Sequence, residues 1–390
     1  MKITLMLAAL LALPSPVPAA DFWVPQNFAT IQEAIDAVPE GARIFVAEGR
    51  YVENIDFGGK AVEVVGAGPA TILDGQGFGP VVRFDSGEGP FSVLDSVTVT
   101  GGSAVQGGGI LIQDASPRVL RSVIAGNQAS QRGSGVFIGG AGAEPDIFNN
   151  LIIFNTNTGS GDPHAIQVDA ASPRIVNNTI VRNDSNGILT AGNGAPEIRN
   201  NILARNGTRF GEFAGRGRGI CDFAAGTVIQ YNLFFRNVRS ALLTAGQDFR
   251  RIRNAEALLQ RGRLAFNIDA APRFSAGRLP RVLEAASAGD FVPSPERLSR
   301  AIGGGDPAPQ YDDADGMRNT IGFTGGPYAP SILAWSASRL RTASSRNSTP
   351  STPAMAPPVS IAGASPPRRI ENLPIPYGPS ARPTNVSTSR

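Results

Sequence analysis

The sequence predicts an all-β protein that folds as a single-stranded, right-handed parallel β-helix (a solenoid), with a short N-terminal capping helix and a disordered C-terminal tail. Its 46 Gly and 31 Pro in 390 residues indicate many turns that join short strands. A unit with two asparagine columns recurs through the middle of the chain, and apolar residues inside that unit alternate with a period of two. Together these observations predict strands that stack coil upon coil.

The repeated unit resembles G-I-x-I followed by S-P-x-I-x-N-N-x-I-x-x-N, and it runs from Gly109 to Asn237. The first column holds Ser122, Asn150, Asn178, Asn201 and Asn232, and the second holds Asn127, Asn155, Asn183, Asn206 and Asn237. Both columns have spacings of 28, 28, 23 and 31 residues, so they keep one register through inserts of unequal length. We expect their side-chain amides to bond along the stack at left-handed turns, which makes them structural.

Each unit also carries apolar positions two residues apart, such as Ile110 and Ile112. A further apolar position recurs once per unit, at Val119, Ile147, Ile175, Ile198 and Ile229. Period two indicates strands, and one unit can bury its apolar face only against its neighbours. Each strand should therefore pair with its equivalent in the next coil, about 4.8 Å away.

We expect three segments along the chain. Residues 1–20 are typical of a cleaved signal peptide, because Lys2 precedes an apolar stretch and small residues follow it. Residues 21–330 should form the β-helix, opened by a capping box from Thr30 to Glu33 and an amphipathic helix. Residues 331–390 are rich in Pro, Ser and Thr and poor in large apolar residues, which predicts a disordered tail.

The net charge of +3 comes from the tail, since residues 331–390 carry seven Arg and one Glu and leave residues 1–330 at −3. Cys221 is the only cysteine, so stability must come from packing and not from an intramolecular disulfide. No segment is long and apolar enough to span a bilayer. We expect a monomer that is secreted, periplasmic or held at the cell surface and that binds no nucleic acid.

The stretches ATIQEAIDAVPEG, YVENIDFGGKAVEVVGAG and SPRIVNNTIVRN resemble the right-handed β-helix families of the pectin-lyase-like class, over residues 22–327. Residues 267–274 and 301–327 resemble the C-terminal coil and the closing segment of secreted members. The class includes polysaccharide lyases, hydrolases, epimerases and proteins with no known reaction. The resemblance therefore implies architecture and leaves activity open.

The inserts that follow the second asparagine column differ in length, with a short one after Asn183 between long ones after Asn155 and Asn206. A short turn between two long ones predicts a groove about 10 Å wide, enough for a sugar chain. The residues expected in it are Asp162, His164, Asp184, Arg209, Glu212, Arg216 and Arg218.

An arginine column borders this groove, because Arg182, Arg205 and Arg236 precede the second asparagine in three successive coils. Guanidinium groups bind carboxylates bidentately, so such a row predicts binding of an acidic polysaccharide such as a polyuronate. The alternative is a solvated face kept for solubility.

Asp162-Pro163-His164 resembles part of the D-P-H motif of alginate C5-epimerases. The resemblance implies that Asp162 and His164 form an acid–base pair acting on the sugar C5 proton. Ala165 departs from the motif, which usually has an acid there, and a plain polar turn is the alternative.

A lyase needs a base for the C5 proton and a positive charge, often Ca²⁺, to stabilise the intermediate. By resemblance to pectate lyases, Arg205 or Arg182 would be the base. No cofactor is certain from the sequence, and Ca²⁺ stays open because the stretch YDDADGMRN resembles a calcium loop. A hydrolase is disfavoured because the repeats carry no paired-acid motif.

The sequence thus predicts an exported β-helix that binds polysaccharide, preferably acidic, and leaves open whether it also cleaves or epimerises that polysaccharide. The alternative is a non-catalytic surface-structural or adhesion protein. Such a binding module would use the arginine column and exposed side chains such as Leu111, Phe137 and Leu189.

Overall fold

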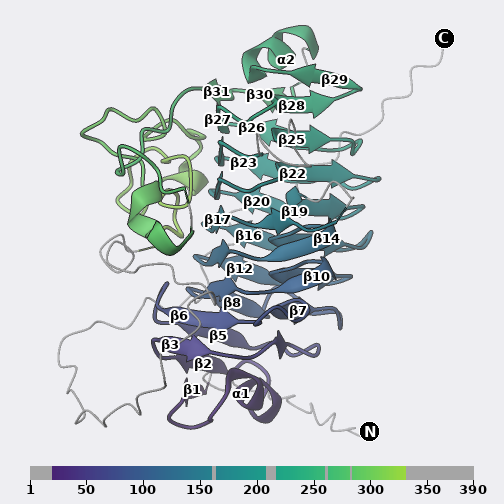
Figure 1. Cartoon of the computed structure of the whole chain (residues 1–390), viewed down its shortest axis with the longest axis vertical. Coiled ribbons are helices and arrows are strands. Elements are labelled where there is room, and N and C mark those ends of the chain that lie inside the picture. The colour runs from purple at the N-terminus through teal and green to yellow at the C-terminus, as the bar shows by residue number, and fades with distance from the viewer. Residues whose placement is uncertain (1–19, 160–163, 208–216, 260–261, 282, 331–390) are drawn as a thin grey trace, which may run out of the picture.

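Three long sheets wind around a single core in the computed structural model, which describes residues 20–159, 164–207, 217–259, 262–281 and 283–330 (Figure 1). The sheets have ten, nine and nine strands, and each coil of the chain adds one strand to each sheet in turn. This architecture is a parallel β-helix and confirms the predicted fold class. The predicted tail and all but residue 20 of the predicted signal peptide lie outside the described residues, so the segment bounds stay predictions.

Sheet A contains β1 (Asp21–Val24), β2 (Arg43–Val46), β5 (Glu63–Gly66), β8 (Val93–Asp95), β12 (Arg118–Leu120), β16 (Asp146–Phe148), β20 (Arg174–Val176), β23 (Glu197–Arg199), β26 (Val228–Gln230) and β30 (Leu264–Ala265). Sheet B contains β3 (Gly49–Tyr51), β6 (Thr71–Asp74), β9 (Thr98–Thr100), β13 (Val123–Ala125), β17 (Leu151–Ile153), β21 (Thr179–Val181), β24 (Ile202–Ala204), β27 (Leu233–Phe235) and β31 (Ile268–Asp269). Sheet C contains β4 (Ile55–Asp56), β7 (Val82–Phe84), β11 (Ile110–Gln113), β15 (Val136–Gly139), β19 (His164–Asp169), β22 (Asn186–Ala191), β25 (Arg218–Asp222), β28 (Ser240–Thr244) and β29 (Gln247–Phe249). Among the described strands, β28 and β29 alone pair antiparallel.

The alternating apolar residues point into the core, as their period of two requires. The once-per-unit position is buried in every coil from Val119 to Ile229. Ile110, Ile112 and their equivalents on the other strands of sheet C join the same cluster. Because each strand pairs in register with its neighbours one coil away, this core is continuous along the stack.

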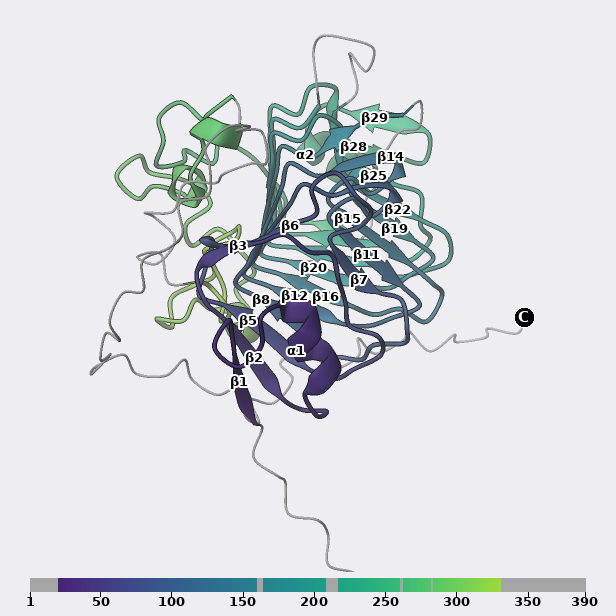
Figure 2. The ribbon, with the colours of Figure 1, turned by 60° about the horizontal axis from the view of Figure 1, so that its bottom comes forward.

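Helices cover both ends of the stack. Helix α1 (Ile31–Ala37) lies across the N-terminal end (Figure 2), with Ile31, Ala34 and Ile35 buried. Its N-cap is the predicted Thr30, whose side chain accepts a hydrogen bond from the Glu33 N–H at 3.1 Å. Helix α2 (Ile252–Leu259) lies at the C-terminal end (Figure 1). No described helix is long and apolar enough to cross a membrane.

The inserts after the second asparagine column leave the stack at one corner, between sheets B and C. Two of them contain β14 (Gln128–Arg132) and β18 (Thr156–Asn157), which pair with β10 (Ser103–Gln106) of the preceding coil into a small insert sheet. The inserts that were expected to form the groove walls continue through residues 160–163 and 208–216, which lie outside the described residues. The predicted groove therefore stays a prediction.

The resemblance to a closing segment implied that the C-terminal segment (residues 270–281 and 283–330) closes the end of the stack. The structure places it elsewhere. It folds back along the outer face of sheet B (Figures 1 and 2) and contains the 3-10 helices η1 (Leu283–Ala285), η2 (Ala288–Phe291) and η3 (Pro309–Tyr311). Phe291 and Phe323 are fully buried there against outward side chains such as Leu151 and Ile202. Sheet B is thus buried on both faces, which its consecutive apolar residues reflect.

Candidate functional site

The corner between sheets B and C, called the B–C corner below, is built on an asparagine ladder. Each Nδ2 of the second asparagine column donates to the Oδ1 of the next asparagine, at 3.0 to 3.2 Å from Asn127 through Asn237. The same amides also donate to buried backbone carbonyls, as Asn183 does to Ile152 at 3.0 Å. The ladder satisfies polar groups inside the stack, which confirms its structural role.

The residue before each of these asparagines takes a left-handed backbone conformation. Arg182, Arg205 and Arg236, the arginine column, have φ angles of 64°, 55° and 50°. A non-glycine residue in this region costs about 1–2 kcal/mol, so the surrounding ladder must impose the conformation. As a result, three guanidinium groups stand in successive coils at one corner, and they range from half-buried at Arg182 and Arg205 to exposed at Arg236.

No acid among the described residues pairs with the positive charges of the arginine column. Burial lowers the pKa of Arg182, and the charges of Arg205 and Arg281 lower it further. Burial and the charge of Arg236 likewise lower the pKa of Arg205. Within the described residues, none of the three column arginines forms an ion pair. Such repulsion between neighbouring cations favours the binding of an anion.

The arginines on the strands of the β-helix differ from the column arginines, because they form ion pairs with acidic side chains. Arg174 forms two bonds of 2.7 Å with Asp146, and Arg43 forms bonds of 2.8 and 2.9 Å with Asp21. Further pairs involve Arg50, Arg83, Arg118, Arg121, Arg132, Arg199, Arg218 and Arg239. The column arginines, which lie in turns after sheet B strands, therefore differ from the arginines of the described strands, which pair with acids.

An aromatic side chain supports the exposed end of the column. The guanidinium carbons of Arg205 and Arg236 lie 5.8 and 5.1 Å from the ring centroid of Phe235. Contacts at this distance are attractive and orient the guanidinium groups without neutralising them.

Beyond Arg236, the column opens into a cleft with a volume of about 410 Å³. Its lining comprises Phe234, Phe235, Arg236, Asn237, Ala241, Arg250, Arg251, Arg253, Asp269, Ala270 and Ala271. Sequence reasoning missed Arg250, Arg251 and Arg253 because they lie outside the repeat. The run RRIR just after the last full repeat was the available signal.

His164 is the first residue of β19 and is only 1% exposed. Its Nε2 lies 3.0 Å from Nδ2 of Asn186, and Oδ1 of that asparagine accepts the N–H groups of Gly217 and Arg218 at 3.0 and 2.8 Å. Those two bonds orient the amide so that its Nδ2 donates to His164, which makes Nε2 the acceptor. Asp162 lies outside the described residues, so the acid–base pair stays a prediction.

Of the other predicted site residues, the structure describes Asp184 and Arg218. Asp184 is an exposed neighbour of the ladder, and partial desolvation raises the pKa of its carboxyl. Arg218 is 8% exposed and donates to Asp248 at 2.6 and 3.0 Å, so a carboxylate of the protein already occupies it. Arg209, Glu212 and Arg216 lie outside the described residues. Of the predicted binding residues, the structure therefore brings together the three of the arginine column.

Two further expectations concern a metal and exposed side chains. In the part of the chain that the structure describes, no group of three or more His, Cys, Asp or Glu residues could hold a metal ion. Asp313 of the calcium-like loop instead accepts hydrogen bonds from Thr320 and Gly326. Phe137, expected at the surface, is 2% exposed, with the guanidinium carbon of Arg132 at 6.0 Å from its ring centroid.

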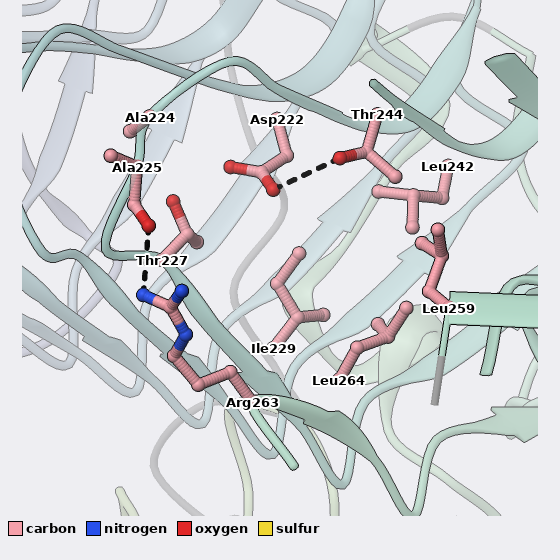
Figure 3. Close-up of a pocket in the computed structure, with 10 residues that line it drawn as sticks. All are labelled: Asp222, Ala224, Ala225, Thr227, Ile229, Leu242, Thr244, Leu259, Arg263 and Leu264. Atoms are coloured by element: carbon pink, nitrogen blue, oxygen red, sulfur yellow. Dashed lines mark hydrogen bonds between the residues drawn. The ribbon is translucent and has the colours of Figure 1, made fainter. Parts of the chain in front are cut away.

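A second, much smaller cavity lies near the C-terminal end of sheet C (Figure 3). Its volume of about 30 Å³ corresponds to roughly one water molecule. The Asp222 carboxylate beside it accepts hydrogen bonds from Thr190 at 2.8 Å and Thr244 at 3.3 Å. This cavity is too small for a sugar, so the arginine-lined corner is the candidate site.

Comparison with known proteins bears on the fold. Residues 86–255 match the family described as right handed beta helix region. No curated protein matches the chain. The crystal structure of pectate lyase Pel9A aligns at 14% identity and a TM-score of 0.47, covering 78% of this chain and 96% of that one. The sheet topology and the matched region together identify this chain as a right-handed parallel β-helix protein.

Proposed function

We propose that this protein is exported and binds an acidic polysaccharide along the B–C corner. The observation that carries the proposal is the arginine column, three cations in successive coils that have no acid partner within the described residues. Rungs of the stack repeat every 4.8 Å or so, which gives a regular row of positive charge. A polymer with one carboxylate per sugar offers the matching row of negative charge.

The alternative of a solvated face is less consistent with the charges. A face kept for solubility is served by exposed, freely hydrated side chains. Arg182 and Arg205 are half-buried, and burial and neighbouring arginines lower the pKa of each. Holding such cations together costs free energy, and an anionic ligand would recover it.

A direct test measures binding of the full chain to polygalacturonate and alginate, with a neutral glucan as the negative ligand. The triple variant Arg182→Gln, Arg205→Gln, Arg236→Gln should weaken binding by about tenfold or more, because each substitution removes a charge-assisted contact. Wild-type binding should also weaken as salt rises from about 0.05 to about 0.5 M.

The matched control removes the same charge from paired positions, as Arg43→Gln, Arg83→Gln and Arg118→Gln. These arginines already bind Asp21, Asp85 and Asp146, so polymer affinity should change by about twofold or less. Equal losses in the two triple variants would mean that only net charge matters and would refute a site at the B–C corner.

A second candidate function is β-elimination of the bound polyuronate, and one observation supports it. The lowered pKa of Arg205 and of Arg182 moves these groups toward a proton acceptor. An arginine base requires a pH well above neutrality, because guanidinium releases its proton reluctantly. Ultraviolet absorbance of unsaturated products, followed at alkaline pH with and without Ca²⁺, tests it. No absorbance change under either condition would leave binding without cleavage.

A further inference from the structure

The cleft beyond Arg236 concentrates more positive charge than any stretch of the arginine column. Arg236 enters it from the turn after β27, Arg250 and Arg251 from the segment after β29, and Arg253 from the first turn of α2. Arg250, Arg251 and Arg253 are exposed, and none of the four forms an ion pair in the described part of the chain. Four arginines from three segments thus line one cleft.

Among the described residues that line the cleft, the one acid, Asp269, is already engaged. Both oxygens of Asp269 accept backbone hydrogen bonds, from Ile252 at 3.1 Å and Arg253 at 3.4 Å. These bonds satisfy two of the orphan N–H groups at the start of α2. The carboxylate therefore serves the helix, and the positive charge in the cleft exceeds the negative charge by three.

Apart from Asn237, the remaining lining is apolar, which suits a sugar ring more than a small inorganic ion. Phe235, Ala270 and Ala271 are half-buried and offer carbon surface beside the arginines, whereas Phe234 and Ala241 belong to the buried core behind them. The volume of about 410 Å³ falls within the range of small-molecule pockets, which combine apolar walls with a few placed polar groups. Such a lining could hold the carbon face of a sugar while guanidinium groups bind its carboxylate.

The cleft also lies where the arginine column ends. Arg236 belongs to both, and Phe235 contacts the guanidinium groups of Arg205 and Arg236 on the way in. Past this coil the stack is covered by α2 (Figure 1), and the RRIR run leads into that helix. A polymer that lies along the column therefore meets the end of the molecule at the cleft.

We infer that this cleft binds the end of an acidic sugar chain, with Arg236, Arg250 and Arg253 engaging carboxylates of the terminal residues. The inference rests on the proposed function, since it adds an end-specific site to the polymer-binding column. It makes the binding directional, because a chain held at its end can extend only toward Arg205 and Arg182.

The test uses calorimetric titration of the full chain with di-, tri- and tetragalacturonate and with the long polymer. The cleft variant Arg250→Gln, Arg253→Gln should lose affinity for the short oligomers by about tenfold or more. The column variant Arg182→Gln, Arg205→Gln should keep short-oligomer affinity within about twofold, while its affinity for the polymer falls to that for a short oligomer. The control pair Arg43→Gln, Arg83→Gln should change neither.

The column variant gives a second readout, because only the cleft remains in it. When samples of the same uronate mass but different chain length are compared, the amount of this variant that binds at saturation should rise in proportion to the number of chain ends. Capacity that follows mass instead would overturn the end-binding inference and leave the proposed function standing. If the wild-type protein does not bind the polymer, the proposed function itself is refuted. Displacement of trigalacturonate by an equal concentration of inorganic phosphate would show a general anion pocket and overturn the sugar assignment.

Discussion

The B–C corner and the corner between sheets A and B, the A–B corner, have the same backbone but opposite surroundings. Each has an asparagine ladder, and that of the A–B corner runs from Asn150 to Asn267 with amide bonds of 3.0 to 3.1 Å. In each, the residue before the ladder asparagine has a left-handed φ. At both corners, the ladder asparagine and the left-handed residue before it therefore serve the same purpose, which is to satisfy buried backbone groups.

The two corners differ in the side chains of their left-handed residues and in what those side chains contact. At the A–B corner the left-handed residues include Asn149, Asn177 and Asn200, and the C-terminal segment packs against them. Asn149 donates to the Phe323 carbonyl at 3.0 Å, Asn177 donates to the Thr320 carbonyl at 3.0 Å, and Asn200 accepts from the Asp306 N–H at 2.9 Å. At the B–C corner the same position holds the arginine column, which the described part of the protein leaves without acid partners. The C-terminal segment thus provides hydrogen-bond partners for the A–B corner asparagines, whereas the described residues provide no acid partner for the column arginines.

The largest expected effect comes from breaking a ladder. In Asn178→Ala the Ile147 carbonyl loses its bond of 2.7 Å, and the Asn150 N–H loses its bond of 2.9 Å. Each buried group left without a partner costs about 1–3 kcal/mol, so the free energy of unfolding should fall by about 3 kcal/mol or more. Urea denaturation followed by circular dichroism measures the loss.

The control for this change is Asn178→Ser. Serine already occupies the equivalent place at Ser122, where its Oγ accepts from the Val97 N–H at 3.3 Å. A hydroxyl can replace part of the amide, so this variant should lose clearly less stability than Asn178→Ala. Equal losses would mean that the ladder amides contribute packing only.

The next effect contrasts the two corners directly, through Asn177→Gly and Arg182→Gly. Glycine accepts the φ of 57° or 64° at these sites without strain, so each variant reports the lost side chain. Asn177→Gly removes the bonds to Asn319, Thr320 and Gly322 and should cost about 1–3 kcal/mol. Arg182→Gly removes no such bond and relieves the left-handed strain, so its stability should stay equal or rise by about 1 kcal/mol.

Limited proteolysis provides a second measurement for the pair. Asn177→Gly should increase cleavage within residues 301–327, since these residues lose an anchor on the stack. Arg182→Gly should leave that cleavage rate unchanged. A destabilised Arg182→Gly variant would show that this arginine has a structural role, against the comparison drawn above.

The sequence was sufficient for the stack because each coil repeats the same local requirement. The two asparagine columns and the recurrent position from Val119 to Ile229 all lie where predicted. The outer asparagines of the A–B corner were visible as Asn-Asn doublets. Their partners were not predictable, since Asn149 and Phe323 lie 174 residues apart in the sequence and belong to no common repeat.

The candidate site was predicted only where it coincides with the repeat. Arg182, Arg205 and Arg236 keep the register of the ladder and so could be placed at one corner. The cleft depends instead on the antiparallel turn from β28 to β29, which returns the chain toward the corner. His164 was expected in an exposed motif, but its pairing with Asn186 places it in a strand of sheet C.

The smallest expected effect contrasts a paired arginine with an unpaired one through pH. Hydrogen bonds from Arg218, Ser240 and Arg239 hold the Asp248 carboxylate, and the bonds from Arg218 are the main reason that its pKa falls to about 2. Because the ordinary pKa is near 3.9 in the unfolded chain, this pairing contributes stability that is fully present above about pH 5. It is lost as the pH falls through about 2. After a discount for solvent exposure, Asp248→Asn should cost about 1 kcal/mol at neutral pH and progressively less toward pH 2.

Arg236→Gln should change stability little at any pH, because no acid of the described chain pairs with it. Urea denaturation of both variants and the wild type across this pH range measures the difference. A loss in Asp248→Asn that stays constant with pH would assign the contact to packing and remove the electrostatic distinction between paired and column arginines.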